Sequence, residues 1–548
     1  MTQPSNNSDQ PELSRVVENL QREKEEALAK KHAEELGLNY QNLTGFQPNP
    51  SAVALVPKDL AKSSRVFAFD KTGTAVRLAV ANPEHAESLA ALKKLEALDE
   101  YTFTPVMVSE SSMDYLLSVY DTFAPEQIKS DGIKIDPKLE AEFSSVANLS
   151  DLKNHLASTS VSELTDAIFA GATALNASDI HIEPTPEQVR LRYRLDGVLL
   201  DITDLNHSVL RNLIDRIKIL SALKLNITEA AQDGRFSITA GTTSYDIRVS
   251  ILPTQYGESA VLRLLPQTGQ FVTLDELGLS SHDRALVDEA IRLPNGLILN
   301  TGPTGSGKTT TLYAILNTVN TKQSKIITVE DPIEYRLTGI TQTQVNEEEN
   351  YSFANALRAI VRQDPDIMLV GEIRDAETAD IAVNAALTGH LVFSTLHTND
   401  AAGAIPRLID LHAQPNLFAD ALRLIIAQRL VRKLCEACHD NAAPTPEEVA
   451  AIKQLDPTAT VPATLSHPTG CAKCNGTGYK GRVGIFEIMK VTASLKSHIL
   501  EGVSASDLRT AAITEGMTTL AQDGLAKVAS QVTSLDELIR VVGESEAA

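Results

Sequence analysis

The sequence predicts a multidomain α/β protein, and three observations support this fold class. First, the chain has 548 residues, which is more than one hydrophobic core can serve. Second, 43% of its residues are hydrophobic and 22% are charged, as in ordinary globular proteins. Third, from residue 296 onward, short apolar runs typical of buried strands end in glycine-rich or acidic segments. We therefore expect three or four domains, one of them built on an α/β sheet.

The first 154 residues are predicted to hold a tail, a small domain and a linker. Residues 1–35 form a polar tail followed by a densely charged helix. Residues 36–120 form a small N-terminal α/β domain. Residues 121–154 carry Pro, Gly, Lys and Asp without periodicity, which is typical of a linker. Within the small domain we expect paired strands and a helix, at residues 66–69, 76–80 and 86–95.

Two larger domains are predicted to follow. A second α/β domain spans residues 155–267, and a P-loop domain spans residues 271–548. The latter includes a cysteine-containing element at 432–484 and a helical tail at 493–543. Strands and one helix of the second domain are expected at residues 180–183, 189–195, 245–250 and 260–265, with the helix at 208–224.

A glycine-rich loop stands between an apolar run at 296–300 and a helical run at 310–316. This order of strand, loop and helix is the setting in which G-x-x-x-x-G-K-[ST] binds nucleotide phosphates. Backbone N–H groups at a helix N-terminus hold the phosphates, Lys308 supplies a positive charge, and the Thr309 hydroxyl can bind Mg²⁺. The predicted residues that bind a nucleoside triphosphate are Gly302, Pro303, Thr304, Gly305, Ser306, Gly307, Lys308, Thr309 and Thr310.

Acidic residues follow two further apolar runs of the P-loop domain. Glu330 ends the run at 324–329, and Glu372 follows the run at 367–370. Hydrolysis needs a carboxylate that orients the attacking water and polar groups around Mg²⁺, so these are the candidates for both roles. His390 and His397 bracket another strand and are candidates for sensing the γ-phosphate or bridging subunits, with a structural role as the alternative.

All four cysteines fall in two C-x-x-C pairs: Cys435, Cys438, Cys471 and Cys474. Two such pairs suit a tetrahedral zinc site, because each short loop presents two thiolates to one ion. Disulfides and a redox C-x-x-C are the alternatives. An intracellular location disfavours the first, and the absence of an obvious helix after either pair disfavours the second.

The overall charge and hydropathy restrict the classes of partner. The net charge of -22 disfavours a nucleic-acid binder with a broad basic surface. No apolar run approaches the ~20 residues that span a bilayer, and residues 1–8 lack the features of a signal peptide. We expect a cytoplasmic protein that binds no nucleic acid and reaches the membrane only through a partner.

The segment at 361–375, VRQDPDIMLVGEIRD, resembles the hallmark of the secretion-superfamily ATPases, the GspE/PilB-like family of type II secretion and type IV pilus assembly. The P-loop, an aspartate box at 328–334, a histidine box at 388–398 and the segment 178–183 are similar to the family's other boxes. The resemblance covers residues 155–540. It implies a RecA-like ATPase domain, a preceding PAS-like domain, a Cys₄ zinc element and a homo-hexameric ring.

The resemblance also implies roles for residues. Arg248 and Arg263 match by position the family's arginine fingers, which complete a neighbour's site; Glu330 would act as general base, and Glu372 would hold the Mg²⁺ shell or help to orient water. Lys308 would bind phosphates, and His397 is the further catalytic candidate. One departure is the short segment at 229–231 before QDGR, where the family carries a basic, Pro-containing stretch.

The function implied is a cytoplasmic hexameric motor, peripheral at the inner membrane, that uses ATP, Mg²⁺ and Zn²⁺ to assemble a type IV pilus. The alternatives are a type II secretion ATPase that drives a pseudopilus and a nucleic-acid translocase. The tetracysteine element favours assembly or secretion over pilus retraction. The N-terminal domain resembles the domain that docks such motors to a membrane platform protein. It lacks an Arg-Leu-Gly motif, so cyclic di-GMP is not expected as a ligand.

Overall fold

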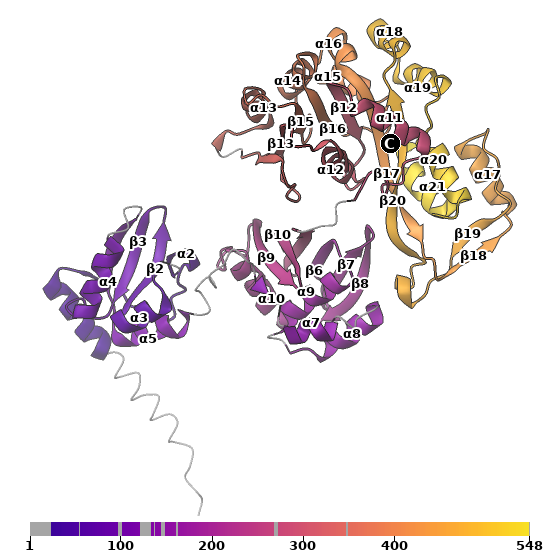
Figure 1. Ribbon diagram of the computed structural model, residues 1–548. Helices are drawn as coiled ribbons and strands as arrows, with labels where there is room; N and C mark the ends of the chain where they lie inside the picture. The colour runs from indigo at the N-terminus through magenta and orange to yellow at the C-terminus, as the bar shows by residue number, and fades with distance from the viewer. Residues whose placement is uncertain are drawn as a thin grey trace, which may run out of the picture.

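The structure, a computed structural model, describes residues 24–53, 55–96, 101–120, 133–135, 137–143, 148–160, 163–267, 272–346 and 349–546. Of the tail and charged helix predicted at residues 1–35, residues 1–23 lie outside the described residues. Within the described part, three large sheets of four, seven and seven strands follow one another along the chain, and a two-stranded sheet, β18-β19, belongs to the cysteine element. Figure 1 shows them as three bodies.

The N-terminal sheet has the strand order β1-β4-β3-β2. The predicted pair of strands is present, and its two members, β2 and β3, are antiparallel. Residues 24–36 are helical, and Glu26 accepts a hydrogen bond of 2.6 Å from the Ser109 hydroxyl, so this charged helix is fixed to the start of α5. The named elements are β1 (Asn39–Tyr40), α2 (Pro50–Val53), α3 (Lys58–Ser64), β2 (Val66–Thr72), β3 (Ala75–Val80), α4 (Ala86–Glu96), β4 (Thr102–Met107) and α5 (Glu110–Ser118).

The second sheet has the order β5-β9-β10-β11-β6-β7-β8 and is antiparallel from β9 to β8. Residues of β7 alternate between a buried face and an outer face that carries Arg190, Arg192 and Arg194. The resemblance of this domain to PAS domains stays a prediction. Its elements are β5 (Ile133–Lys134), α7 (Pro137–Phe143), α8 (Leu149–Ser158), α9 (Leu164–Ala174), β6 (Asp179–Pro184), β7 (Val189–Leu195), β8 (Val198–Leu205), α10 (His207–Leu220), β9 (Gln232–Ala240), β10 (Thr243–Thr254) and β11 (Gly257–Pro266).

The segment predicted to be a linker contains regular structure where it is described. β5 pairs with β9, and the buried side chains of Leu139, Phe143 and Leu152 belong to the core of the second domain. Each short element contributes only one or two apolar residues, so the sequence between residues 121 and 154 shows no periodicity. The prediction of a linker is therefore wrong for these described parts.

The third sheet has the order β14-β13-β15-β16-β12-β17-β20, and its strands are parallel except for β20. Every residue of β12 and β16 is buried, as expected for parallel strands that helices cover on both faces. The elements of this domain are α11 (Ser281–Ala290), β12 (Gly296–Thr301), α12 (Lys308–Val319), β13 (Ile326–Glu330), β14 (Thr341–Gln344), α13 (Phe353–Val361), β15 (Ile367–Val370), α14 (Ala376–Leu387), β16 (Leu391–Leu396), α15 (Ala404–Asp410), α16 (Pro415–Ala421), β17 (Leu422–Leu434) and β20 (Tyr479–Lys490).

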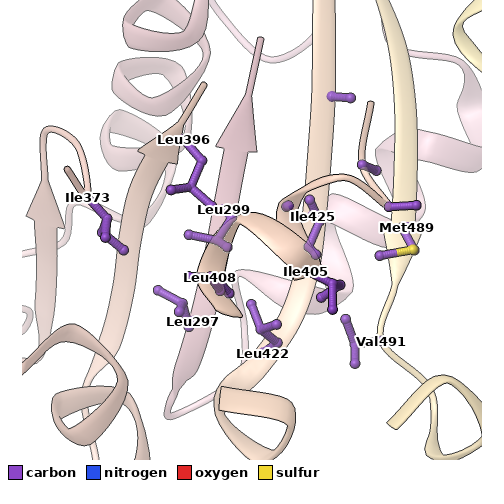
Figure 2. Close-up of a cluster of buried hydrophobic side chains, with 14 of the residues drawn as sticks. Leu297, Leu299, Ile373, Leu396, Ile405, Leu408, Leu422, Ile425, Met489 and Val491 are labelled. Carbon is purple, nitrogen blue, oxygen red and sulfur yellow. The ribbon is translucent and has the colours of Figure 1, made fainter. Parts of the chain in front are cut away.

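Two hydrophobic cores hold this sheet, one on each face. Leu297 and Leu299 of β12 join one core, and Ile298 between them joins the other. Figure 2 shows the first core, where Leu299 lies near Ile425 of β17 and Leu408 of α15. Because both faces are covered, polar groups of the sheet are left at the ends of its strands.

The predicted cysteine element and helical tail are both present. β17 leads into the cysteine element, and β20 returns from it antiparallel to β17. The element consists of β18 (His439–Ala442), α17 (Pro446–Leu455), β19 (Leu465–Pro468) and η2 (Ala472–Cys474), and the tail of α18 (Ala493–Glu501), α19 (Ala505–Thr514), α20 (Leu520–Ala529) and α21 (Leu535–Glu546). Across the described ranges, no helix has both the length and the apolar character needed to cross a membrane.

Candidate active site and metal centre

Four polar segments meet at one edge of the third sheet. The glycine-rich loop follows β12, Glu330 ends β13, Glu372 comes two residues after β15, and His397 directly follows β16. These four strands are neighbours and parallel, so their carboxyl ends lie together. We call this set, residues 302–309 with Glu330, Glu372 and His397, the carboxyl edge.

The glycine-rich loop is shaped by glycines that no other residue could replace without strain. Gly302 has a φ of 150°, and a Cβ there would lie 2.6 Å from both the Gln428 carbonyl oxygen and the Ser306 hydroxyl. Gly307, with a φ of 90°, caps the N-terminus of α12. The loop therefore presents backbone N–H groups and the helix N-terminus to an anion.

Two side chains of the loop are set up for phosphate oxygens. The buried Ser306 hydroxyl has no hydrogen-bond partner within the described chain. Lys308 Nζ donates to the Gly302 and Pro303 carbonyl oxygens at 2.7 and 3.1 Å. Burial, together with the nearby charge of Arg429, lowers the pKa of Lys308 to about 8. An unpaired hydroxyl and a partly desolvated ammonium fit a polyphosphate.

Glu372 lies at the centre of a charged cluster beside Lys308. Its Oε1 is 2.5 Å from Arg374 NH2, and its Oε2 is 3.5 Å from His397 Nε2. The Glu372 charge acts on Lys308 and favours its protonated form. Burial and the Lys308 charge lower the pKa of His397, so its ring favours the neutral form. Glu372 and His397 are thus brought together at the mouth of the loop.

Glu330 is 4% exposed and is held by three donors. Thr328 Oγ1 and Gln342 Nε2 donate to Oε1 at 2.5 and 3.1 Å, and the Tyr313 hydroxyl donates to Oε2. Burial raises the pKa of Glu330 in spite of these bonds. A carboxylate that is both fixed and more basic than usual is suited to accept a proton.

The two predicted arginine fingers lie side by side on the second sheet, where cross-strand register pairs Arg248 of β10 with Arg263 of β11. Arg248 reaches the third domain: its NH2 donates to the Ile333 carbonyl oxygen at 2.8 Å, and its NH1 is 3.4 Å from Glu334 Oε2. Arg263 Nε donates to Asp179 Oδ1 at 2.9 Å. Arg248 therefore links the second sheet to the segment that follows Glu330.

His390 does not join the carboxyl edge. It precedes β16, whereas His397 follows it, so the two histidines stand at opposite ends of one strand. Its Nδ1 lies 3.0 Å from the Ala385 carbonyl oxygen at the end of α14. This contact assigns His390 a structural position.

Several residues at the carboxyl edge were not predicted. Tyr313 binds Glu330 from α12, and the buried amide of Gln428 accepts a hydrogen bond of 2.8 Å from Thr311 beneath the loop. Arg429 donates to the Asn399 carbonyl oxygen at 2.9 Å. Tyr313 lies in α12, the helix that follows the loop, and this position in the sequence could have marked it as a candidate. Gln428 and Arg429 belong to β17, and no motif marks them.

The four cysteine sulfur atoms lie within 4.8 Å of one another. Cys435 and Cys438 follow the end of β17, Cys471 precedes η2, and Cys474 is the last residue of η2. None forms a disulfide. Burial opposes ionisation of Cys474, but hydrogen bonds from the Cys471 backbone, the Cys438 thiol and the Gly478 backbone lower its pKa to about 6. Four converging thiols with N–H donors fit a metal ion.

The comparison with protein families agrees with this geometry. Residues 154–540 match the family described as Type II/IV secretion system protein, which is more than half of the chain. The chain belongs to this family. Residues 36–123 match the MshEN domain. As a member of the type II/IV secretion family, the protein is an ATPase of pilus assembly or of secretion, and its third domain is a RecA-like ATPase domain.

Individual relatives come from both systems. The Type IV pilus assembly ATPase PilB of Myxococcus xanthus is 37% identical over 499 residues, which cover 91% of this chain and 88% of that protein. Type II secretion system protein E of Pseudomonas aeruginosa is 43% identical over 451 residues, which cover 82% and 87%. Among solved structures, the ATPase DotB of Legionella pneumophila is similar in fold, with a TM-score of 0.51, 24% identity and coverage of 68% and 93%.

Proposed function

We propose that this protein is a ring-forming motor that hydrolyses ATP to assemble a type IV pilus at the inner face of the cell membrane. The observation that favours a pilus is the extent of similarity. The pilus assembly relative aligns over 91% of this chain, against 82% for the secretion relative, although the latter is more identical. The alignment with the pilus assembly relative therefore leaves less of this chain unmatched.

In this proposal, the carboxyl edge holds the nucleotide and directs water to it. Residues 302–310 bind the phosphates through backbone N–H groups, the Ser306 hydroxyl and Lys308 Nζ. To contact a phosphate, Lys308 Nζ gives up its hydrogen bonds to the Gly302 and Pro303 carbonyl oxygens. Thr309 and Glu372 would hold Mg²⁺, which supplies electrostatic stabilisation to the phosphates when bound. The free Ser306 hydroxyl and the fold of the loop support this assignment.

Glu330 is proposed as the general base. Hydrolysis forms a bond between the water oxygen and the γ-phosphorus, breaks the bond to the β–γ bridging oxygen, and releases a proton from the water. Glu330 accepts that proton. Its burial raises its pKa, and donors from Thr328 and Gln342 keep its orientation fixed. His397, half-exposed beside Glu372, would sense the γ-phosphate.

Arg248 and Arg263 are proposed as arginine fingers in a homo-hexamer, where they would complete a neighbour's site. Charge accumulates on the transferring phosphoryl group, and a guanidinium stabilises it. Within its own chain, Arg248 contacts Ile333 and Glu334 of the segment that follows Glu330. In the proposed ring, its guanidinium would exchange this contact for the neighbour's nucleotide.

The tetracysteine cluster is proposed as a structural zinc site held by Cys435, Cys438, Cys471 and Cys474. The site would stabilise the tip of the β17–β20 pair. Metal analysis of the purified protein should give about one zinc per chain, as one Cys₄ site binds one ion. Cys435→Ser should remove this zinc, and retention of a full equivalent would contradict the assignment.

The N-terminal domain, including its MshEN region, is proposed to dock the motor to a polytopic platform protein of the inner membrane, which would make the protein cytoplasmic and peripheral. No nucleic acid is expected as a partner.

The test is a crosslinked pull-down from membranes of the source cells with the Glu330→Gln variant and ATP. This variant should hold ATP and stay on its platform, whereas Lys308→Ala serves as the control that binds no nucleotide. Recovery of a platform protein together with pilins would support pilus assembly. Recovery of pseudopilins and secretion components instead would establish the second candidate, type II secretion, which the higher identity of the Pseudomonas aeruginosa relative favours. Recovery of neither would contradict both.

A further inference from the structure

The segment Gln232–Arg235 at the start of β9 contains two residues with clear structural roles. The first is Gln232, whose Oε1 accepts from the Lys224 N–H, and whose Nε2 donates to the Lys224 and Ile227 carbonyl oxygens, all at 3.0 Å. This amide therefore closes the turn between α10 and β9.

The second structural residue is Gly234. A Cβ at this position would lie 2.9 Å from Ser221 Cβ and Leu223 Cδ2 and 3.0 Å from the Ser221 carbonyl oxygen. Only glycine allows β9 to approach the end of α10 so closely. Gln232 and Gly234 together fix where the next residue, Arg235, stands.

Arg235 itself is exposed and has no hydrogen bond or ion pair within the described residues. Its neighbour Phe236 is buried in the core of the second domain, so by strand alternation Arg235 faces the opposite side of the sheet. Cross-strand register places it directly opposite Arg248. Arg235, Arg248 and Arg263 thus form a row across three neighbouring strands, which we call the arginine row.

The three arginines of this row differ in whether they have an acidic partner. Arg263 is paired with Asp179, and Arg248 with Glu334. Arg235 has no such partner in the described chain, and like charges directly opposite each other on adjacent strands are destabilising. A bound anion would remove this repulsion. β5 pairs with β9 only at Ile238 and Thr239, so the strand edge beside Arg235 is free of described strands.

We infer that Arg235 is a third arginine that contacts the phosphates of ATP in the assembled ring. The inference rests on the proposed function, because it needs the arginine row to face a nucleotide. Arg248 already reaches the segment after Glu330, and Arg235 lies one strand further along the same row. Its guanidinium offers a planar pair of donors to phosphate oxygens.

The test compares Arg235→Gln with Arg211→Gln in the full-length protein. Arg211 lies on α10 and is 89% exposed, with only a weak contact to Asp215, so its loss is a matched control for surface charge. Phosphate release, binding of fluorescent ATP and ADP analogues, and native mass spectrometry would be measured. We expect Arg235→Gln to lower kcat about tenfold or more and to weaken ATP more than ADP, with the ring intact. Arg235→Lys should recover only part of the rate.

Two outcomes would overturn the inference. One is a kcat for Arg235→Gln within about twofold of wild type, since a phosphate contact in the transition state is worth more than that. The other is loss of the ring with a normal rate per remaining ring, which would make Arg235 a subunit contact. Failure of the proposed function would show in different measurements: the pull-down would recover other partners, or the wild-type protein would not hydrolyse ATP.

Discussion

The two seven-stranded sheets of this protein carry functional side chains in different places. In the third sheet, parallel strands such as β12 and β16 are buried along their whole length, and the chemistry stands at their carboxyl ends. In the second sheet, antiparallel strands bury one face only. Along each strand, core residues that point to the buried face alternate with outer-face residues, and the arginines are among the latter. A parallel sheet thus concentrates function at an edge, whereas an antiparallel sheet spreads it across a face.

This difference determines how function is read from sequence. A polar residue after an apolar run already marks the carboxyl edge. On the outer face of the second sheet, however, every second residue is a candidate, and Arg190, Arg192 and Arg194 of β7 look no different in sequence from Arg248 or Arg263. The family resemblance and the register between strands, which pairs Arg248 with Arg263, are what separate them.

The largest effect is expected at the carboxyl edge, and two lysines at opposite ends of the third sheet test it: Lys308 at the start of α12 and Lys325 before β13. Lys308→Ala should abolish nucleotide binding and lower phosphate release by about 10³-fold or more, because it removes the charge that faces the phosphates. Lys325 lies at the opposite end, just before β13, where it bonds the Gln363 carbonyl oxygen. Lys325→Ala should therefore leave the rate nearly unchanged. Equal losses in both variants would contradict the contrast between the two ends of the sheet.

A smaller but still large effect is expected on the arginine row. Arg263→Ala should lower kcat about 10²-fold or more in a phosphate-release assay. Arg194 is the matched control, because it also pairs with the buried Asp179, with its Nε 3.1 Å from Asp179 Oδ2. If Arg194→Ala lost as much activity as Arg263→Ala, the effect would lie in the support of Asp179 and the proposed finger role would fail.

The smallest effect is a pH dependence at the carboxyl edge. The pKa of Lys308 is lowered to about 8, so raising the pH through this value removes the charge that binds phosphates. The Kd for ATP should rise between pH 7 and pH 9, by at most about tenfold for each pH unit above the pKa. Titration with a fluorescent ATP analogue would measure it. Lys308→Arg keeps its charge, so its profile should be flat; a flat wild-type profile would refute the expectation.

The glycine-rich loop and the four cysteines could be predicted from sequence because their chemistry depends on local spacing. Glu330 and Glu372 were found because both follow apolar runs, but their different surroundings depend on Gln342 and Arg374, which the fold brings in. His390 and His397 were indistinguishable until β16 separated them.

Structure that depends on distant partners could not be predicted. β5, α7 and α8 are ordered by the core of the second domain, to which each adds few apolar residues, so their sequence resembled a linker. Gln428 and Arg429 reach the loop from β17, more than a hundred residues along the chain. Arg235 becomes a candidate for phosphate contact only through its register with Arg248.

The most direct test of the account is single-turnover and steady-state phosphate release by Glu330→Gln, measured together with its affinity for ATP. The account predicts that turnover falls by at least about 10²-fold, because the proton acceptor is lost, while the Kd for ATP stays within about threefold of wild type. Turnover at the wild-type rate would contradict the claim that the buried carboxylate at the end of β13 activates water for the motor.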